Sequence, residues 1–140
     1  MKKQKLGFTL IEVLIVVSII GLLTSATLLG LGSFRQTGRD ARRISDLRQI
    51  QNALELFYAK NSAYPNALSD ITTAGIGITS LPKDPNTNVD YEYSKTNCPA
   101  GVSYVLRAVF EDANNRALAD QGTICNLDCS KAAKGYCITF

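Results

Sequence analysis

The chain has 140 residues, enough for one small domain and one additional segment. Its formal net charge of +3 comes from Lys2, Lys3 and Lys5, so the remainder is balanced and offers no basic domain for obligatory nucleic-acid binding. The sequence has no histidine, no glycine-rich phosphate loop and no activated-serine motif. We therefore predict no enzyme activity, no catalytic residue, no cofactor and no metal site.

Residues 1–7 form a short basic leader in front of a long apolar run. From Val13 to Leu31 there are 19 residues without a charge or a proline. As a helix they would measure about 28 Å, close to the thickness of a bilayer's hydrocarbon core. A conventional signal peptide has a shorter apolar core followed by small residues at a cleavage site, and this run does not match it. The run therefore predicts a membrane-spanning helix.

The helical pattern continues beyond the apolar run. Apolar residues recur at steps of three and four, at Ala41, Ile44, Leu47, Ile50, Leu54 and Phe57. The charged residues between them, which are Arg39, Asp40, Arg42, Arg43, Asp46, Arg48 and Glu55, are expected on a solvated face. We predict one helix from about residue 8 to 60, with a membrane-spanning segment 8–34 and an amphipathic segment 35–60. Gly30 and Gly32 weaken this helix locally, and Pro65 cannot continue it.

The last part of the chain favours a small sheet. Residues 61–88 contain three prolines and predict a connecting loop with a short helical turn near residues 67–72. After residue 89 the period changes to two, which predicts strands near 89–94, 101–112, 118–125 and 135–140 in an antiparallel meander. The expected fold is α+β, with the amphipathic half of the long helix packed on one face of this sheet.

Four cysteines lie in the predicted sheet region, at Cys98, Cys125, Cys129 and Cys137. An even number in the part outside the membrane favours disulfides and an oxidising compartment, although the spacing does not decide among three possible pairings. A zinc site is the alternative, but there is no histidine and the spacing of Cys125 and Cys129 differs from the usual C-x-x-C.

Glu12 is the one acid within the apolar segment. An ionised, unpaired carboxylate in hydrocarbon costs several kcal/mol, unless it reaches the headgroup region near the helix end. Cleavage after Gly7 would give Phe8 a free α-amine one helical turn from Glu12. This cation could pair with Glu12 of its own chain or of a neighbour. Pairing between chains would draw identical helices into a bundle in one register, which predicts an assembly role for Glu12 and Phe8.

The stretch KLGFTLIEVLIVVSIIGLL resembles the N-terminal signature of type IV pilins and pseudopilins. The resemblance implies that a prepilin peptidase cleaves between Gly7 and Phe8 and methylates the Phe8 amine. It also implies a bacterial subunit held in the cytoplasmic membrane with its C-terminal domain outside. An assembly platform and its ATPase would then add the subunit to a helical homopolymer. The charges flanking the apolar run do not fix this orientation, which follows from the family alone.

Two family branches and one non-polymerising alternative remain open. The motifs YP, LPKDP and YEY in residues 64–93 resemble major pseudopilins of type II secretion and also several small pilins. Major pseudopilins usually end in an acidic calcium-binding loop, whereas Glu111, Asp112, Asn114 and Asp120 follow no calcium-loop spacing. The cysteines favour a pilin that forms an extracellular pilus. The alternatives are a type II secretion pseudopilin and a membrane-anchored domain that does not polymerise. The sequence does not distinguish adhesion, motility, DNA uptake and secretion.

Overall fold

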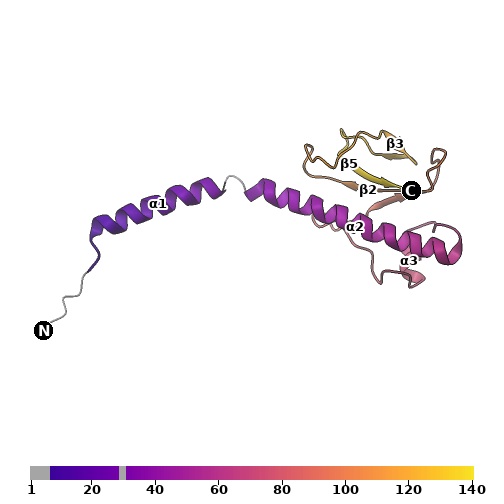
Figure 1. The fold of residues 1–140 in the computed structure, drawn as a ribbon, viewed down its shortest axis with the longest axis horizontal. Helices are drawn as coiled ribbons and strands as arrows, with labels where there is room; N and C mark the ends of the chain where they lie inside the picture. Colours follow the sequence, from indigo (N-terminus) through magenta and orange to yellow (C-terminus); the bar gives the residue numbers. More distant parts are fainter. Residues whose placement is uncertain (1–6, 29–30) are drawn as a thin grey trace. The chain divides into compact units, whose positions relative to one another are not determined.

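The computed structural model describes residues 7–28 and 31–140, which belong to two compact units that meet between Arg35 and Gln36. In the first unit, helix α1 runs from Leu10 to Leu28 (Figure 1). Helix α2 runs from Leu31 to Asn61, close to the predicted end of the long helix. Whether the helix is continuous between them, and whether it unwinds at Gly30, concerns positions outside the described residues. Gly32 lies within α2.

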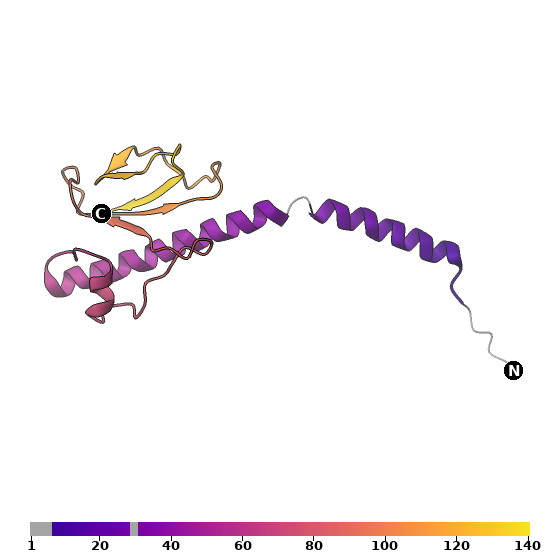
Figure 2. The ribbon, with the colours of Figure 1, turned by 180° about the vertical axis from the view of Figure 1, so that it is seen from behind.

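The second unit is an α+β domain, as the sequence predicts. The short helix α3 (Ser69–Thr73) lies within the predicted loop. A three-stranded antiparallel sheet has the order β1 (Glu92–Ser94), β2 (Val105–Val109), β5 (Gly135–Thr139). Register is set by the pairs Tyr93 with Leu106 and Leu106 with Ile138. Figure 2 shows α2 along one side of this sheet and the short strands of residues 123–128 on the other.

The main core lies between α2 and the sheet. Its buried members come from α2, from α3 and the loop around it, from the residue before β1, from alternate positions of β2 and its two flanking residues, and from the loop after β2: Leu47, Ile50, Ala53, Leu54, Leu68, Ile71, Ile78, Tyr91, Tyr104, Leu106, Ala108, Phe110 and Leu118. This confirms the amphipathic face of α2 and the alternation of β2, in which Leu106 and Ala108 face inward. Burial of this apolar surface is the main favourable contribution to folding.

The predicted strand 118–125 is wrong in extent and in pairing. Only Thr123–Ile124 form a strand, β3, which pairs with β4 (Leu127–Asp128) in a separate two-stranded sheet. Cys125 and Asn126 between them have φ values of 49° and 69°, the left-handed geometry of a two-residue hairpin turn. This turn reverses the chain at once, so the segment cannot run on as a strand of the main sheet.

The β3–β4 hairpin and the four cysteines form a second, smaller core on the outer face of the sheet. The disulfides join Cys98 with Cys125 and Cys129 with Cys137, which confirms the predicted disulfide bonding and resolves its pairing. Cys125, Cys129 and Val105 are buried together, with Val102, Ile124 and Leu127 packed around them. Gly135 allows the close approach of this lobe, because a Cβ there would stand 2.4 Å from the carbonyl oxygen of Asp128. The sheet is thus covered on both faces.

The solvated face predicted for α2 is partly wrong. Asp40, Arg43 and Asp46 are buried, whereas Ala41, expected in the core, is exposed. The acids of α2 accept hydrogen bonds from the sheet layer: Asp46 from the hydroxyl of Tyr91 at 2.8 Å, and Glu55 from that of Tyr104 at 2.9 Å. These charges are buried because partners distant in sequence satisfy them.

Candidate functional site

The predicted cleavage site lies just before α1. Gly7, Phe8 and Thr9 have no regular secondary structure, and α1 begins at Leu10. The Phe8 side chain is 89% exposed, and no atom lies within 4 Å of the place where a Cβ on Gly7 would stand. An irregular segment beside a helix start presents its peptide bond openly, as proteolysis requires.

Glu12 is bound to the start of its own helix. The backbone amide of Thr9 donates to Oε2 of Glu12 at 2.9 Å, and the Thr9 hydroxyl donates to the same oxygen at 2.7 Å. The amide of Glu12 in turn donates to Oγ1 of Thr9 at 3.4 Å. Thr9 and Glu12 therefore form a capping box, in which a threonine at the N-cap and an acid three residues later satisfy helix-end amides reciprocally. Oε1 of Glu12 has no partner among the described residues.

Apolar side chains lie on all sides of α1. Its large apolar residues between Leu10 and Leu23 are more than half exposed within the chain, so no described residue of the first unit covers them. The hydroxyls of Ser18 and Thr24 donate to carbonyl oxygens one turn earlier, at 2.8 and 2.7 Å. These polar groups are therefore satisfied inside the helix, which suits an apolar environment. Among the described residues, no helix meets the combined requirement of length and hydropathy for a candidate membrane span.

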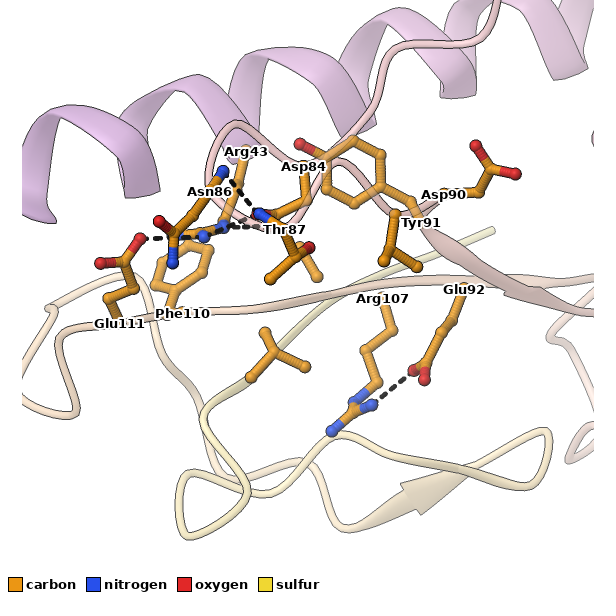
Figure 3. A pocket seen from close by; sticks show the side chains of 13 residues that line it. Arg43, Asp84, Asn86, Thr87, Asp90, Tyr91, Glu92, Arg107, Phe110 and Glu111 are labelled. Carbon is orange, nitrogen blue, oxygen red and sulfur yellow. Dashed lines mark hydrogen bonds and ion pairs between the residues drawn. The ribbon is translucent and has the colours of Figure 1, made fainter.

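A second group of functional side chains is a buried ionic cluster in the second unit. Arg43 is 2% exposed and lies among three carboxylates. Its guanidinium donates to Asp40 at 2.6 Å. It also donates to Asp84 at 2.5 Å and 3.0 Å and pairs with Glu111 at 3.0 Å (Figure 3). Arg39 also binds Glu111. The cluster connects α2 with the loop before β1 and with the end of β2.

Backbone groups complete this cluster. Asp40 accepts the amides of Glu111 and Asp112 at 3.0 and 3.1 Å, while Asp84 accepts those of Asn86 and Thr87 at 2.9 Å each. Burial opposes ionisation of Asp84, but the hydrogen bonds from Arg43 and the two amides outweigh it and hold the pKa of Asp84 well below its ordinary value. The bond from Arg39 is the main reason why the pKa of Glu111 is also lowered.

Comparison with known proteins identifies the N-terminal segment. Residues 2–28 match a family model described as the prokaryotic N-terminal methylation motif. A type II secretion system core protein G from Vibrio cholerae is 35% identical over 107 residues, which are 66% of this chain and 72% of the relative. Its counterpart from Escherichia coli is 32% identical over 105 residues, 74% of this chain and 72% of that protein. The chain belongs to the type IV pilin and pseudopilin family.

Other relatives of this pilin-family chain align over less of their length. The core protein G of Aeromonas hydrophila is 33% identical over 64 residues, which are 45% of that protein. No solved structure matches the chain. The pilin and the pseudopilin interpretations both agree with the family, and in both the chain is a structural subunit.

In this pilin-family chain the predicted site residues separate into two places. Gly7, Phe8 and Glu12 lie together at the start of α1, while the cysteines lie in the second unit and pair there. Sequence reasoning missed the role of Thr9, although the signal S/T-x-x-E before an apolar run was present as Thr9-Leu10-Ile11-Glu12. It also missed the ionic cluster around Arg43, for which periodicity carries no signal.

Proposed function

We propose that this pilin-family subunit is processed between Gly7 and Phe8 and polymerises through its N-terminal helix. The observation that carries the proposal is the arrangement at the start of α1. An open peptide bond precedes a capped, apolar helix, and one oxygen of Glu12 is unpaired within the described part of the chain. A prepilin peptidase would release residues 1–7 and methylate Phe8.

Capping changes what Glu12 needs from a neighbour. Its Oε2 already accepts two hydrogen bonds from Thr9, which reduces the cost of placing a carboxylate in an apolar environment. It still carries a negative charge, and no residue that the structure describes places a cation beside it. The α-amine of Phe8 in a neighbouring subunit would supply a positive charge, and it could bind Oε1 without breaking the bonds between Thr9 and Oε2. This division of the two oxygens makes Glu12 suited to pairing between chains.

The remaining steps follow from family membership. Residues 8–34 would hold the subunit in the bacterial cytoplasmic membrane, with the second unit outside. The uncharged run from Val13 to Leu31 supports this anchoring. An inner-membrane platform and its ATPase would then move subunits into a homopolymer whose core is the bundle of N-terminal helices. No nucleic acid and no catalysis are needed for this role.

Two destinations of the filament are supported by different observations. The relatives are named core proteins of type II secretion, which favours a pseudopilus that serves secretion. The disulfide-bonded lobe favours a surface pilus, since disulfides persist in an oxidising environment and stabilise small domains that are exposed outside the cell. Electron microscopy of fibres from the native cell, identified by mass spectrometry, distinguishes a long extracellular pilus from a short pseudopilus.

The test of processing and assembly uses the full chain co-expressed with a prepilin peptidase and an assembly platform. Intact mass is expected to show a chain that begins at Phe8 and carries one methyl group. Glu12→Gln keeps an acceptor for Thr9 but removes the charge, so it should be processed normally and fail to form filaments. Thr9→Ser keeps both the cap and the charge and is the matched control. Filaments of normal abundance from Glu12→Gln would contradict the assembly role, and a mature chain that still begins at Met1 would contradict the processing step.

A further inference from the structure

Three tyrosine rings are in contact where α2 meets the start of β2. The rings of Tyr58 and Tyr64 are stacked with their centroids 4.7 Å apart, and the ring of Tyr104 meets that of Tyr64 edge-on at 4.7 Å. Both arrangements are among those that aromatic pairs prefer. Tyr58 is 46% exposed, whereas Tyr104 is completely buried. The three rings therefore form a continuous line of contacts from the surface of the second unit to its core.

Glu55 accepts hydrogen bonds from both inner tyrosines. The Tyr64 hydroxyl donates to Oε1 at 3.2 Å and to Oε2 at 3.1 Å, and the Tyr104 hydroxyl donates to Oε1 at 2.9 Å. Within the described part of the chain no ion pair includes Glu55. The carboxylate therefore faces two phenol protons, at the distances from which a positioned base accepts a proton.

Both inner phenols keep their protons at neutral pH. Burial is the main cause that raises the pKa of Tyr64 and of Tyr104 above the ordinary value, and the hydrogen bonds to Glu55 act in the same direction. A phenol becomes a strong acid when its ring loses an electron. Oxidation of either ring would therefore drive its proton along the existing hydrogen bond to Glu55.

Tyr91 shows that a buried tyrosine of this domain is satisfied by less. Its hydroxyl donates to one carboxylate, that of Asp46, at 2.8 Å, and it is 7% exposed. Among the described residues its ring contacts no other aromatic ring. One acceptor is enough for a buried hydroxyl. The line of rings from Tyr58 to Tyr104 is therefore an arrangement that hydrogen bonding alone does not require.

We propose that Tyr64, Tyr104 and Glu55 form a site of reversible one-electron oxidation, which one-electron oxidants such as peroxyl radicals reach through the exposed ring of Tyr58. The oxidant takes one electron from Tyr58 and is reduced. Tyr64 then gives an electron to Tyr58 while its own hydroxyl proton moves to Glu55. The products are the reduced oxidant, a neutral phenoxyl radical on Tyr64 and a neutral Glu55 carboxylic acid, because the electron and any proton that Tyr58 gave up both return to it.

The hydrogen bond from Tyr104 to Glu55 gives the second inner ring the same reaction. A reductant such as ascorbate reverses the step, since it supplies one electron to the phenoxyl ring while Glu55 returns the proton. The radical would thus be held inside the second unit and away from the exposed ring, where two chains can couple through a bond between their tyrosines. The inference does not depend on the filament proposal.

The test uses the full-length chain in detergent micelles, with photo-oxidised ruthenium tris-bipyridine as the one-electron oxidant. Dityrosine cross-links at Tyr58 are measured by peptide mass spectrometry after illumination. Tyr64→Phe keeps the ring packing but interrupts the line of oxidisable rings, so the radical should remain on Tyr58 and the cross-links should increase severalfold. Glu55→Gln keeps an oxygen acceptor for the hydroxyls but is not a base at neutral pH, and it should have the same effect. Tyr91→Phe is the matched control and should leave the cross-links unchanged.

A kinetic measurement separates proton transfer from a change in packing. Transient absorption of the phenoxyl radical should show that transfer from Tyr58 to the inner rings is about a hundredfold slower in Glu55→Gln, the lower limit of what a positioned base contributes. Transfer in the unchanged protein should also slow in heavy water, because a proton moves in that step. Equal cross-linking of Tyr58 in all four proteins would overturn the proposal. Transfer at an unchanged rate in Glu55→Gln, or an effect of Tyr91→Phe as large as that of Tyr64→Phe, would also overturn it.

Discussion

Arg43→Met is expected to destabilise the second unit severely, because it removes a cation that is 2% exposed and faces three carboxylates. Asp40 is completely buried and would keep only its backbone donors. Loss of one partner from a buried ionic group costs about 3 to 5 kcal/mol. Since a domain of this size has a total free energy of unfolding of about 5 to 15 kcal/mol, this is a large fraction of its stability.

Arg42→Met is the matched control for this variant. Arg42 is the preceding residue of the same helix, but its side chain is 68% exposed and its nearest acid, Asp46, is 3.9 Å away. An exposed pair of this kind contributes about 0 to 1 kcal/mol. The assay is urea unfolding of the mature chain in micelles at pH 7, followed by circular dichroism. A loss of stability in Arg43→Met no larger than that in Arg42→Met would refute the ionic cluster as a stabilising element.

The same pair of variants gives a pH dependence with a defined sign. The pKa values of Asp84 and Glu111 are lowered in the folded state, so their contribution to stability is fully present above the ordinary carboxyl range. It is lost as the pH falls through that range and toward the lowered values, from about pH 5 downward. Arg43→Met lacks the part of this contribution that Arg43 supplies, mainly at Asp84, so the stability gap between it and the unchanged protein should narrow as the pH falls. A gap that widens in acid would contradict the sign of the argument.

Three further outcomes test the helix start, the glycines and the disulfides. Thr9→Val should destabilise the start of α1 by about 1 kcal/mol, seen as faster hydrogen exchange of its first amides, while Thr9→Ser should not. Gly38→Ala, in a helical position with no atom within 4 Å of the new Cβ, should stabilise the second unit by up to about 1 kcal/mol, whereas Gly135→Ala should lower its melting temperature through the clash with Asp128. Reduction of both disulfides should expose the β3–β4 hairpin to hydrogen exchange while α2 stays protected. If the hairpin and α2 lose their protection together, the two cores do not unfold separately.

The parts of the fold that depend on apolar periodicity could be predicted from the sequence. Leu47, Ile50 and Leu54 line the core face of α2, and Leu106 alternates inward on β2, as their spacing indicates. The end of α2 at Asn61 agrees with the break before Pro65. Periodicity works here because each of these side chains gains stability from any apolar neighbour, so its position on the element is sufficient.

The buried charges could not be predicted in the same way. Arg43 is stable in the interior because, in addition to Asp40 on its own helix, Asp84 and Glu111 reach it from 41 and 68 positions along the chain. A helical pattern contains no information about such partners, and it therefore assigns a charged residue to solvent. The prediction of a strand over residues 118–125 failed for a related reason. The chain reverses at Cys125 and Asn126, two residues with left-handed backbone geometry, and neither is the glycine that would signal such a turn.

The separate roles of the two Glu12 oxygens affect how a growing fibre of the kind proposed above would reject subunits added in the wrong register. The cap on Oε2 is complete before any neighbour arrives, so a newly added subunit contributes one charge contact and not the rescue of an unfolded helix end. A subunit that binds one helical turn out of register, about 5.4 Å along the axis, would bury nearly the same apolar surface. It would, however, leave the α-amine of Phe8 and Oε1 of Glu12 unpaired in hydrocarbon. Such a misplaced subunit would dissociate most readily. The Glu12 carboxylate would then determine the register of the subunits, while the apolar surface of the helix would supply most of the binding free energy.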